Sequence, residues 1–277
     1  MEIGLTLFAT DLAISPVELA REAEARGFHS LYLPEHTHIP VSRETPPPTG
    51  EAELAPEYKR TLDPWIALAA ACSVTERLLL GTGIALVAQH DPIVLAKEIA
   101  TLDLLSAGRV VLGVGYGWNR EEMRDHGVDP RTRRARVRET VLAMQALWSE
   151  EEASFEGEFI RFPKCWQWPK PVQHPRPRTL LGGAAGPTLF AHIAEYADGW
   201  LPIGGAGLRE AIPELRRVVE ARGRDPRALH IAPMGVIPDE RKLEHYREIG
   251  VTEAVLRVPA GGREVVLPVL DAYTRYL

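Results

Sequence analysis

Residues 77–115 read RLLLGTGIALVAQHDPIVLAKEIATLDLLSAGRVVLGVG and contain one complete strand-helix-strand unit. The apolar runs at 77–84 and 109–115 predict two strands, because short and nearly uninterrupted apolar stretches are typical of parallel strands covered on both faces. Between them, Asp91-Pro92 predicts a helix start, since aspartate caps helix N-termini and proline suits the first helical position. This helix is expected to end before Gly108.

The same unit recurs along the chain. Ser15 and Glu18 form a predicted capping box, and Asp63-Pro64 repeats the cap-plus-proline start. We expect strands at 2–8, 29–34, 77–84, 109–115, 179–183, 198–205, 229–237 and 252–259, and helices at 15–27, 63–74, 91–107, 133–148, 186–197, 208–223, 239–250 and 263–277. Eight alternating units predict an α/β fold, a closed (β/α)8 TIM barrel, as a single domain spanning residues 1–277.

Residues 151–178 interrupt this rhythm and predict an insertion between strands 4 and 5. EGEFIRF (156–162) is typical of a short hairpin arm, and CWQWPKPVQHPRPR (165–178) of an irregular proline-rich segment. We expect the insertion, together with the long segment 37–62, to roof the pocket of the barrel.

Composition excludes several classes of protein. The 277 residues are 45% hydrophobic and carry 38 acidic against 32 basic side chains, a formal charge of −6. Such a balance argues against a nucleic-acid or anionic-membrane partner and leaves a small-molecule substrate as the expected one. Cys72 and Cys165 have no zinc-site spacing and are expected to pack. Without a signal-peptide pattern or a long apolar span, the chain is expected to be cytoplasmic.

In a (β/α)8 barrel, the loops that follow the strands carry the chemistry, whereas the opposite end serves stability. Asp103, Ser106 and Arg109 precede strand 4 and are therefore assigned to packing at the stable end. The candidate residues at strand ends are Glu35, His36 and His38; Gly83 and Ile84; Gly115, Tyr116, Gly117 and Trp118; Gly182, Gly183, Ala184 and Ala185; and Gly204 and Gly205.

The segment EHTH (35–38) leaves three interpretations open. Glu35, His36 and His38 could belong to a metal site, but the other strand ends offer few ligands, mostly glycines. The histidines could instead form hydrogen bonds within their own loop. We favour the third interpretation, in which His36 lies beside a bound cofactor and serves as a proton donor or hydrogen-bond donor.

The glycine-rich strand ends suit a flat ligand that carries a phosphate. GVGYGW (113–118) lacks the third glycine of a dinucleotide-binding fingerprint. Its glycines would let a ring approach the backbone, with Tyr116 and Trp118 as a wall, although tight packing would also explain them. LLGGAAGP (180–187) and PIGG (202–205) offer free amides and a helix start, which bind anions, although turn formation alone would also explain these glycines.

These segments resemble a known family. GLTLF near the start, LPEH, the run from RLLLGTGI through TLDLLSAGRVVLGVGYGWNREEM, WPKPVQ, LLGG and EYADGWLP are similar to the bacterial luciferase-like family, most closely its branch of coenzyme F420-dependent oxidoreductases. The similarity runs to about residue 205.

The resemblance implies a barrel that holds a deazaflavin or flavin at its C-terminal face, usually within a homodimer. It implies catalytic roles for His36 and Glu35, cofactor contacts from the strand-end residues named above, and a cis peptide between Gly83 and Ile84 behind the ring. Where sugar-phosphate dehydrogenases of this branch carry a catalytic glutamate, this chain has Trp118, with Glu121 and Glu122 a few residues later. That departure argues against a sugar-phosphate substrate.

The expected reaction is hydride transfer between coenzyme F420 and a small organic substrate that the sequence does not identify. The first alternative is an FMN-dependent monooxygenase of the same fold, since a flavin activates oxygen whereas a deazaflavin transfers hydride. A metal-dependent barrel hydrolase and a catalytically silent flavin-binding protein are weaker alternatives.

Overall fold

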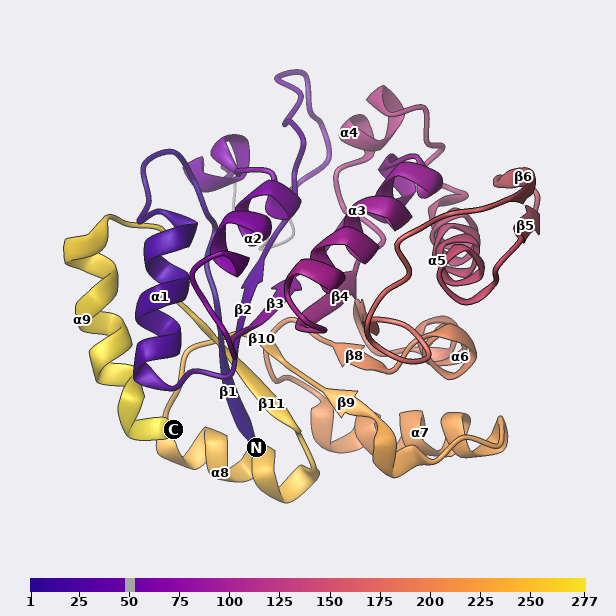
Figure 1. Ribbon diagram of the computed structural model, residues 1–277. Coiled ribbons are helices and arrows are strands. Elements are labelled where there is room, and N and C mark those ends of the chain that lie inside the picture. Colours follow the sequence, from indigo (N-terminus) through magenta and orange to yellow (C-terminus); the bar gives the residue numbers. More distant parts are fainter. Residues whose placement is uncertain (48–52) are drawn as a thin grey trace.

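Parallel strands surrounded by helices make up the molecule (Figure 1). The computed structural model describes residues 1–47 and 53–277. The strands of the sheet, in spatial order, are β10 (Met234–Val236), β11 (Glu253–Arg257), β1 (Glu2–Thr6), β2 (Ser30–Leu33), β3 (Leu79–Thr82), β4 (Val110–Val114), β7 (Arg178–Gly182), β8 (Gly199–Leu201) and β9 (His230–Ile231). The helices are α1 (Pro16–Arg26), α2 (Pro64–Cys72), α3 (Pro92–Leu105), α4 (Arg120–Asp125), α5 (Arg133–Ser149), α6 (Pro187–Tyr196), α7 (Leu208–Ala221), α8 (Glu240–Ile249) and α9 (Arg263–Tyr273), with 3-10 turns η1 (Pro56–Arg60), η2 (Val87–Gln89), η3 (Pro226–Ala228) and η4 (Thr274–Tyr276).

The first and last strands in this order, β10 and β9, are two parts of one extended stretch, and this stretch closes the ring. On one side of it, the amide of Ala232 donates to the carbonyl of Trp200 over 2.9 Å, and on the other side the amide of Val255 donates to the carbonyl of Pro233 over 3.0 Å. The interruption falls at Pro233, which has no N–H to donate. The stretch therefore fills one of eight ring positions, and the predicted (β/α)8 TIM barrel is confirmed.

The helix starts expected from the sequence are present. The Ser15 hydroxyl accepts from the amide of Glu18 over 3.2 Å, and the carboxylates of Asp63 and Asp91 cap α2 and α3 in the same way. Gly27 ends α1 with a φ of +90°, a conformation that glycine adopts without steric cost. Local residue choice alone therefore accounts for where these helices begin and for where α1 ends.

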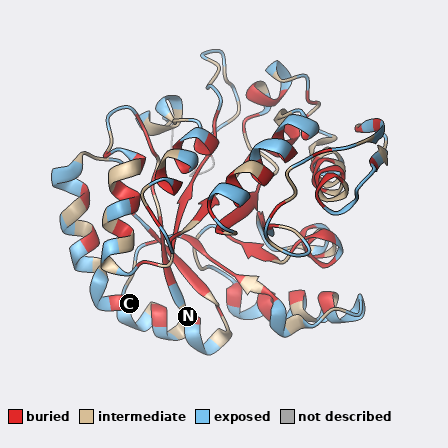
Figure 2. Cartoon of the chain, viewed as in Figure 1, coloured by how far each residue is buried: buried red, intermediate tan, exposed pale blue. Residues whose placement is uncertain are grey.

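The core has two layers because successive strand residues point to opposite faces of the sheet. In β4, Val111 points into the barrel, whereas Val110 and Leu112 pack outward with the helices. The interior cluster consists of Tyr32, Val111, Leu180, Leu201, Ala232, Met234 and Val255. Figure 2 shows the consequence, with buried strands at the centre and helices that are buried on one face and exposed on the other.

The insertion contains the predicted hairpin. Strands β5 (Ala153–Glu156) and β6 (Arg161–Cys165) pair antiparallel and lie beside α5 (Figure 1). The carboxylate of Glu139 on α5 accepts the amide of Phe159 at the hairpin turn over 2.7 Å. A carboxylate from the middle of α5 thus fixes the hairpin to the side of the barrel.

The expectation that 151–178 roofs the pocket is wrong. This segment must connect the end of α5 to the start of β7, and both lie at the end of the barrel opposite the strand-end loops. The side-chain amide of Gln173 donates to Asp103 over 2.6 Å, and the amide of Val172 donates to the same carboxylate over 2.7 Å. The described part of segment 37–62 does lie over the mouth, where it contacts Trp118.

The assignment of Asp103, Ser106 and Arg109 to the stable end is confirmed. Besides its bonds to the insertion, Asp103 is completely buried. The Arg109 guanidinium donates to the hydroxyl of Thr75 and to the carbonyl of Leu78, each over 2.9 Å, and to the carbonyl of Ser106 over 2.8 Å. These bonds join the segments that precede β3 and β4.

No helix among residues 1–47 and 53–277 combines the length and apolar character that a membrane crossing requires.

Candidate active site at the barrel mouth

The ends of β3, β4 and β7 converge on Ile84. A Cβ built on Gly115 would lie 2.2 Å from Cδ1 of Ile84, and one on Gly182 would lie 2.9 Å from Cγ2 of Ile84. The peptide bond between Gly83 and Ile84 is cis, as the resemblance implies. The structure therefore brings Gly83, Ile84, Gly115 and Gly182 together, and side chains at 115 and 182 would displace Ile84.

His36 takes part in a buried chain of hydrogen bonds. Its Nδ1 lies 2.8 Å from Oε2 of Glu122 on α4, and the side chains of His36 and Glu122 are 7% and 1% exposed. The indole N–H of Trp118 donates to Nε2 of His36 over 3.3 Å, and the amide of Thr37 donates to Oε1 of Glu122 over 3.2 Å.

This chain defines the tautomer of His36. A carboxylate only accepts hydrogen bonds and an indole N–H only donates. Nδ1 of His36 therefore carries the proton that faces Glu122, and Nε2 offers a lone pair to Trp118. The lone pair makes Nε2 the basic atom of His36, and Glu122 stabilises a positive charge that forms on the ring.

An aromatic enclosure surrounds His36. The ring centroid of Tyr58 on η1 lies 5.5 Å from that of His36 and 5.9 Å from that of Trp118, and Phe8 lies 4.7 Å from Tyr58. The guanidinium of Arg43 lies 5.7 Å over the Trp118 ring. Aromatic rings from three separate segments thus shield the His36 side chain from water.

Tyr116 and Trp118 do not form one continuous wall. Gly117, with a φ of +74°, turns the chain between them. Whereas Trp118 contacts His36, the hydroxyl of Tyr116 lies 2.9 Å from Nδ1 of His192 on α6. Burial raises the pKa of Tyr116 and lowers that of His192, so this pair is a neutral hydrogen bond at neutral pH.

Glu35 contacts the loop after β3. Its carboxylate accepts the amide of Leu86 over 2.5 Å and lies 2.8 Å from Nε2 of His90, with the side chain only 2% exposed. Burial disfavours the charged form of His90, but the hydrogen bond and the charge of Glu35 outweigh it and raise the pKa of His90. Because both carboxylate oxygens are occupied, these contacts favour a positioning role for Glu35 over a proton-transfer role.

The loop after β7 offers amides to an anion. Gly183 adopts a φ of +142°, and its carbonyl accepts a hydrogen bond from the indole N–H of Trp200 over 2.9 Å. Within the described residues, the amides of Ala184, Ala185 and Gly186 have no hydrogen-bond partner. They lead into α6, whose N-terminus has no side-chain cap. Such a helix start binds phosphate through backbone N–H groups.

The loop after β8 is engaged differently. The amide of Gly204 donates to the carbonyl of Met234 over 2.8 Å, and a Cβ on Gly205 would lie 1.9 Å from the hydroxyl of Tyr246. Gly205 thus allows close packing against α8, whereas Gly204 turns the chain with a φ of +66°. Within the described residues, the amides of Gly205, Ala206 and Gly207 have no backbone partner either.

The histidine segment has a second contact with α4. His38 lies partly exposed with its Nε2 3.0 Å from Oδ2 of Asp125. In the part of the chain that the structure describes, no group of three or more histidine, cysteine, aspartate or glutamate side chains could hold a metal ion. EHTH therefore joins the loop after β2 to α4 through two separate pairs.

Four residues near these candidates were not assigned from the sequence: Tyr58, His90, Glu122 and His192. Glu122 had a signal, since Asn119 caps α4 by accepting the amide of Glu122, so that the carboxylate stands in the first turn of a helix directly after a strand-end loop. Tyr58, His90 and His192 are brought to the mouth by tertiary packing alone.

Comparisons with known proteins identify the family of the chain. The model of the luciferase-like monooxygenase family matches residues 15–259. An uncharacterised protein of Mycobacterium tuberculosis is 48% identical over 94% of this chain and 92% of its own length. An F420-dependent glucose-6-phosphate dehydrogenase of Kineococcus radiotolerans is 31% identical over 75% of this chain, which spans 58% of that protein.

Two solved structures share the fold. The monooxygenase RslO1 from Streptomyces bottropensis has a TM-score of 0.79 at 22% identity, covering 100% of this chain and 98% of that one. An F420-dependent secondary alcohol dehydrogenase in complex with an F420-acetone adduct has a TM-score of 0.78 at 19% identity, with the same coverage. At these identities the two structures establish the architecture alone.

Proposed function

The chain belongs to the luciferase-like monooxygenase family, and from that premise we propose that it is an oxidoreductase that transfers a hydride between coenzyme F420 and a small organic substrate. The F420 assignment is supported by F420-dependent relatives that are 28–31% identical. The observation that carries the proposal is the buried chain Trp118–His36–Glu122, which prepares one basic nitrogen at the barrel mouth.

The residues at the mouth fit a ring that bears a phosphate. The free amides of 184–186 and the uncapped start of α6 would hold the phosphate. Ile84, at the meeting point of three strand ends, would lie against the ring, and His36 would lie beside its reacting edge. When bound, the deazaflavin supplies the hydride chemistry, and the protein orients the substrate and excludes water.

His36 would move the proton that accompanies the hydride. In the oxidative direction, Nε2 of His36 accepts the proton of a substrate hydroxyl. The hydroxyl takes the place of the Trp118 indole N–H, which donates to Nε2 over 3.3 Å in the structure. Glu122 stabilises the resulting imidazolium, and in the reductive direction Nε2 returns the proton. Tyr58 and Trp118 limit the size of the substrate and exclude water from this nitrogen.

Cofactor titration of the purified protein tests this proposal. We expect F420 to bind at least about tenfold more tightly than FMN, and Gly183→Val to weaken F420 binding, since valine combines a side chain with a positive φ beside the free amides. Tighter binding of FMN, followed by oxygen consumption with reduced FMN, would establish the monooxygenase alternative instead. If neither F420 nor FMN binds, both the F420-dependent oxidoreductase and the FMN-dependent monooxygenase are refuted.

Two accompanying properties are also proposals. From the family resemblance we propose a homodimer, and from the composition a cytoplasmic enzyme. Sedimentation at several protein concentrations tests the dimer.

A further inference from the structure

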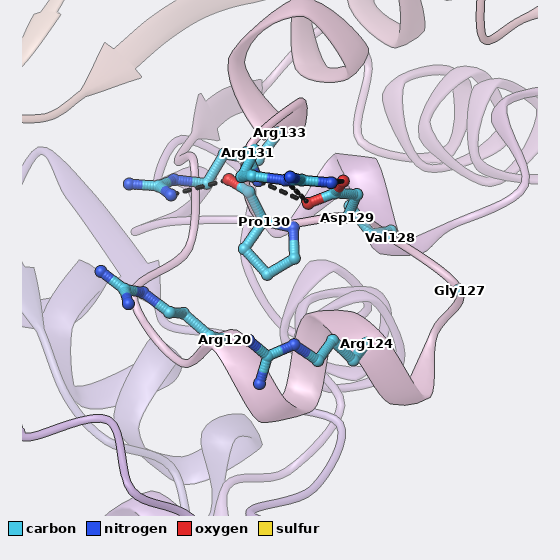
Figure 3. Close-up of a pocket in the computed structure, with 8 residues that line it drawn as sticks. All are labelled: Arg120, Arg124, Gly127, Val128, Asp129, Pro130, Arg131 and Arg133. Atoms are coloured by element: carbon cyan, nitrogen blue, oxygen red, sulfur yellow. Dashed lines mark hydrogen bonds and ion pairs between the residues drawn. The ribbon is translucent and has the colours of Figure 1, made fainter.

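A hollow lined by arginines lies between α4 and the segment that leads into α5. Its volume is about 700 Å³, and it is lined by Arg120, Arg124, Gly127, Val128, Asp129, Pro130, Arg131 and Arg133. In Figure 3, Arg120 and Arg124 come from α4 on one side, Arg131 and Arg133 lie on the other, and the ring of Pro130 stands between them. We call this feature the arginine hollow.

The arginine hollow has a strong excess of positive charge. Four guanidinium groups face one acidic lining residue, Asp129, and Arg131 already pairs with that carboxylate over 2.7 Å. Arg124 reaches only the neighbouring Glu121, at 3.7 Å. In a chain with a formal charge of −6, this is a local concentration rather than a property of the whole surface.

Two of the guanidinium groups lack acidic partners. Among the residues that the structure describes, Arg120 has no hydrogen bond or ion pair, and the Nε of Arg133 is buried without an acceptor. Burial lowers the pKa of Arg133, and the positive charges of Arg134 and Arg120 lower it further. The Nη1 group of Arg133 donates to the carbonyl of Pro130 over 2.8 Å, so among the described residues its positive charge has no acidic partner.

The start of α5 adds to the positive charge of the arginine hollow. Helix N-termini favour acidic residues because the backbone N–H groups carry partial positive charge. Here the first turn of this 17-residue helix contains Arg133 and Arg134 and no acid, and Thr132 provides no side-chain cap. Residue choice thus opposes the local preference, which is typical of a functional site rather than of a stabilising one.

We propose that the arginine hollow binds a multiply charged anion, either a chain of phosphates or an oligocarboxylate. Arginine suits both groups because its planar fork makes paired hydrogen bonds to phosphate and carboxylate oxygens. The anion is either part of a ligand that extends from the mouth or a separate molecule. On α4, Arg120 and Arg124 lie one turn apart, and Glu122 lies on the opposite face against His36. The bound anion therefore contacts the helix that positions the candidate base.

Titration of the full chain with inorganic tripolyphosphate and with citrate, at low and physiological salt, tests this proposal without the cofactor. We expect binding that weakens with salt, and Arg120→Gln to weaken it by roughly tenfold because a charge-assisted contact is lost, whereas binding at the amides of 184–186 would be unaffected by Arg120→Gln. Arg133→Gln is the second variant, with its folding checked by thermal unfolding. Arg21→Gln, which removes a positive charge that is also exposed, from α1, is the matched control.

Absence of binding at millimolar anion, or equal losses in Arg120→Gln and Arg21→Gln, would overturn the proposal. Competition distinguishes the two sources of the anion: if tripolyphosphate weakens F420 binding in the parent chain but not in Arg120→Gln, the anion belongs to the cofactor. If F420 binding is unchanged, the anion is a separate ligand. Since the first titration contains no cofactor, its failure is distinct from failure of the proposed function.

Discussion

Replacing Glu122 with glutamine tests how the structure activates His36. Glutamine keeps the size of the side chain but exchanges one accepting oxygen for a donating NH2 group. One of the two donors that now face Glu122, Nδ1–H of His36 or the amide of Thr37, would lose its acceptor. If the new NH2 donates to Nδ1, the proton of His36 shifts to Nε2, and this atom can no longer accept a proton from the substrate.

The expected magnitude follows from these contacts. Loss of positioned proton transfer lowers the rate by about 10²-fold or more, and one unsatisfied buried group lowers the free energy of unfolding by about 1–3 kcal/mol. Cofactor affinity should stay within about twofold, since Glu122 contacts His36 and Thr37 rather than the anion-binding amides. His36→Ala should lower the rate at least as much as Glu122→Gln.

The assay is single-turnover hydride transfer at saturating cofactor, followed over a range of pH and in heavy water. Glu121→Gln is the matched control, because it removes the adjacent carboxylate, which contacts Thr45 and, at 3.7 Å, Arg124 rather than His36. We expect a larger solvent isotope effect in Glu122→Gln than in the parent enzyme. A Glu122→Gln rate within about threefold of the parent, or a loss equal to that of Glu121→Gln, would refute the role of this carboxylate.

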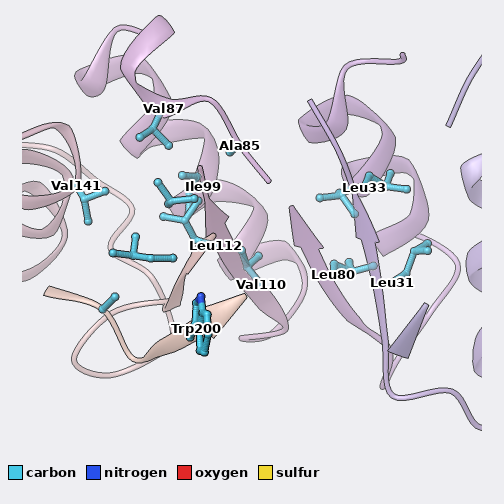
Figure 4. Packing of buried hydrophobic residues seen from close by; sticks show 14 of the residues in the cluster. Leu31, Leu33, Leu80, Ala85, Val87, Ile99, Val110, Leu112, Val141 and Trp200 are labelled. Carbon is cyan, nitrogen blue, oxygen red and sulfur yellow. The ribbon is translucent and has the colours of Figure 1, made fainter. Parts of the chain in front are cut away.

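Three further predictions concern the cofactor loop and the fold. Gly183→Val should weaken cofactor binding in an equilibrium titration while leaving the far-ultraviolet circular dichroism spectrum unchanged; unchanged affinity would place the phosphate elsewhere. Leu112→Ala, in the packed outer layer of β4 (Figure 4), should lower the free energy of unfolding in urea by about 2–5 kcal/mol, and a loss below about 1 kcal/mol would contradict its full burial. Burial alone would raise the pKa of Glu253, but hydrogen bonding and charge attraction from His230 hold it below its ordinary value of 4.5. The stability that this lowered pKa provides is present above pH 4.5 and is lost as the pH falls through the folded-state pKa, so Glu253→Gln should show a shallower loss of stability in acid than the parent chain.

The sequence predicted the barrel because its signals are local. The cap at Asp91 with Pro92 and the apolar run of β4 depend on residues within one turn or one strand, and both are present. The path of 151–178 was predicted wrongly because a loop's course depends on where its two ends lie. Once α5 and β7 are placed, the segment must follow the side of the barrel.

The candidate site was only partly predictable for the same reason. Strand-end position identified His36 and the glycines around Ile84, since barrel topology fixes that end of every strand. The pair of His36 and Glu122 joins residues 86 positions apart, and no pattern of spacing reveals such a contact. Likewise, the amide of Gly204 donates to the carbonyl of Met234, and this hydrogen bond depends on how two neighbouring strands pair.

Anaerobic turnover with F420 tests the central claim most directly. The purified protein is mixed with oxidised F420 and a panel of small alcohols, or with reduced F420 and a panel of carbonyl compounds and enones, and the absorbance of the deazaflavin is followed. The account predicts a change in the redox state of F420 that needs a substrate and proceeds without oxygen. Its rate should be about 10²-fold lower in His36→Ala. Turnover seen only with reduced FMN and oxygen, with no change in F420, would contradict it.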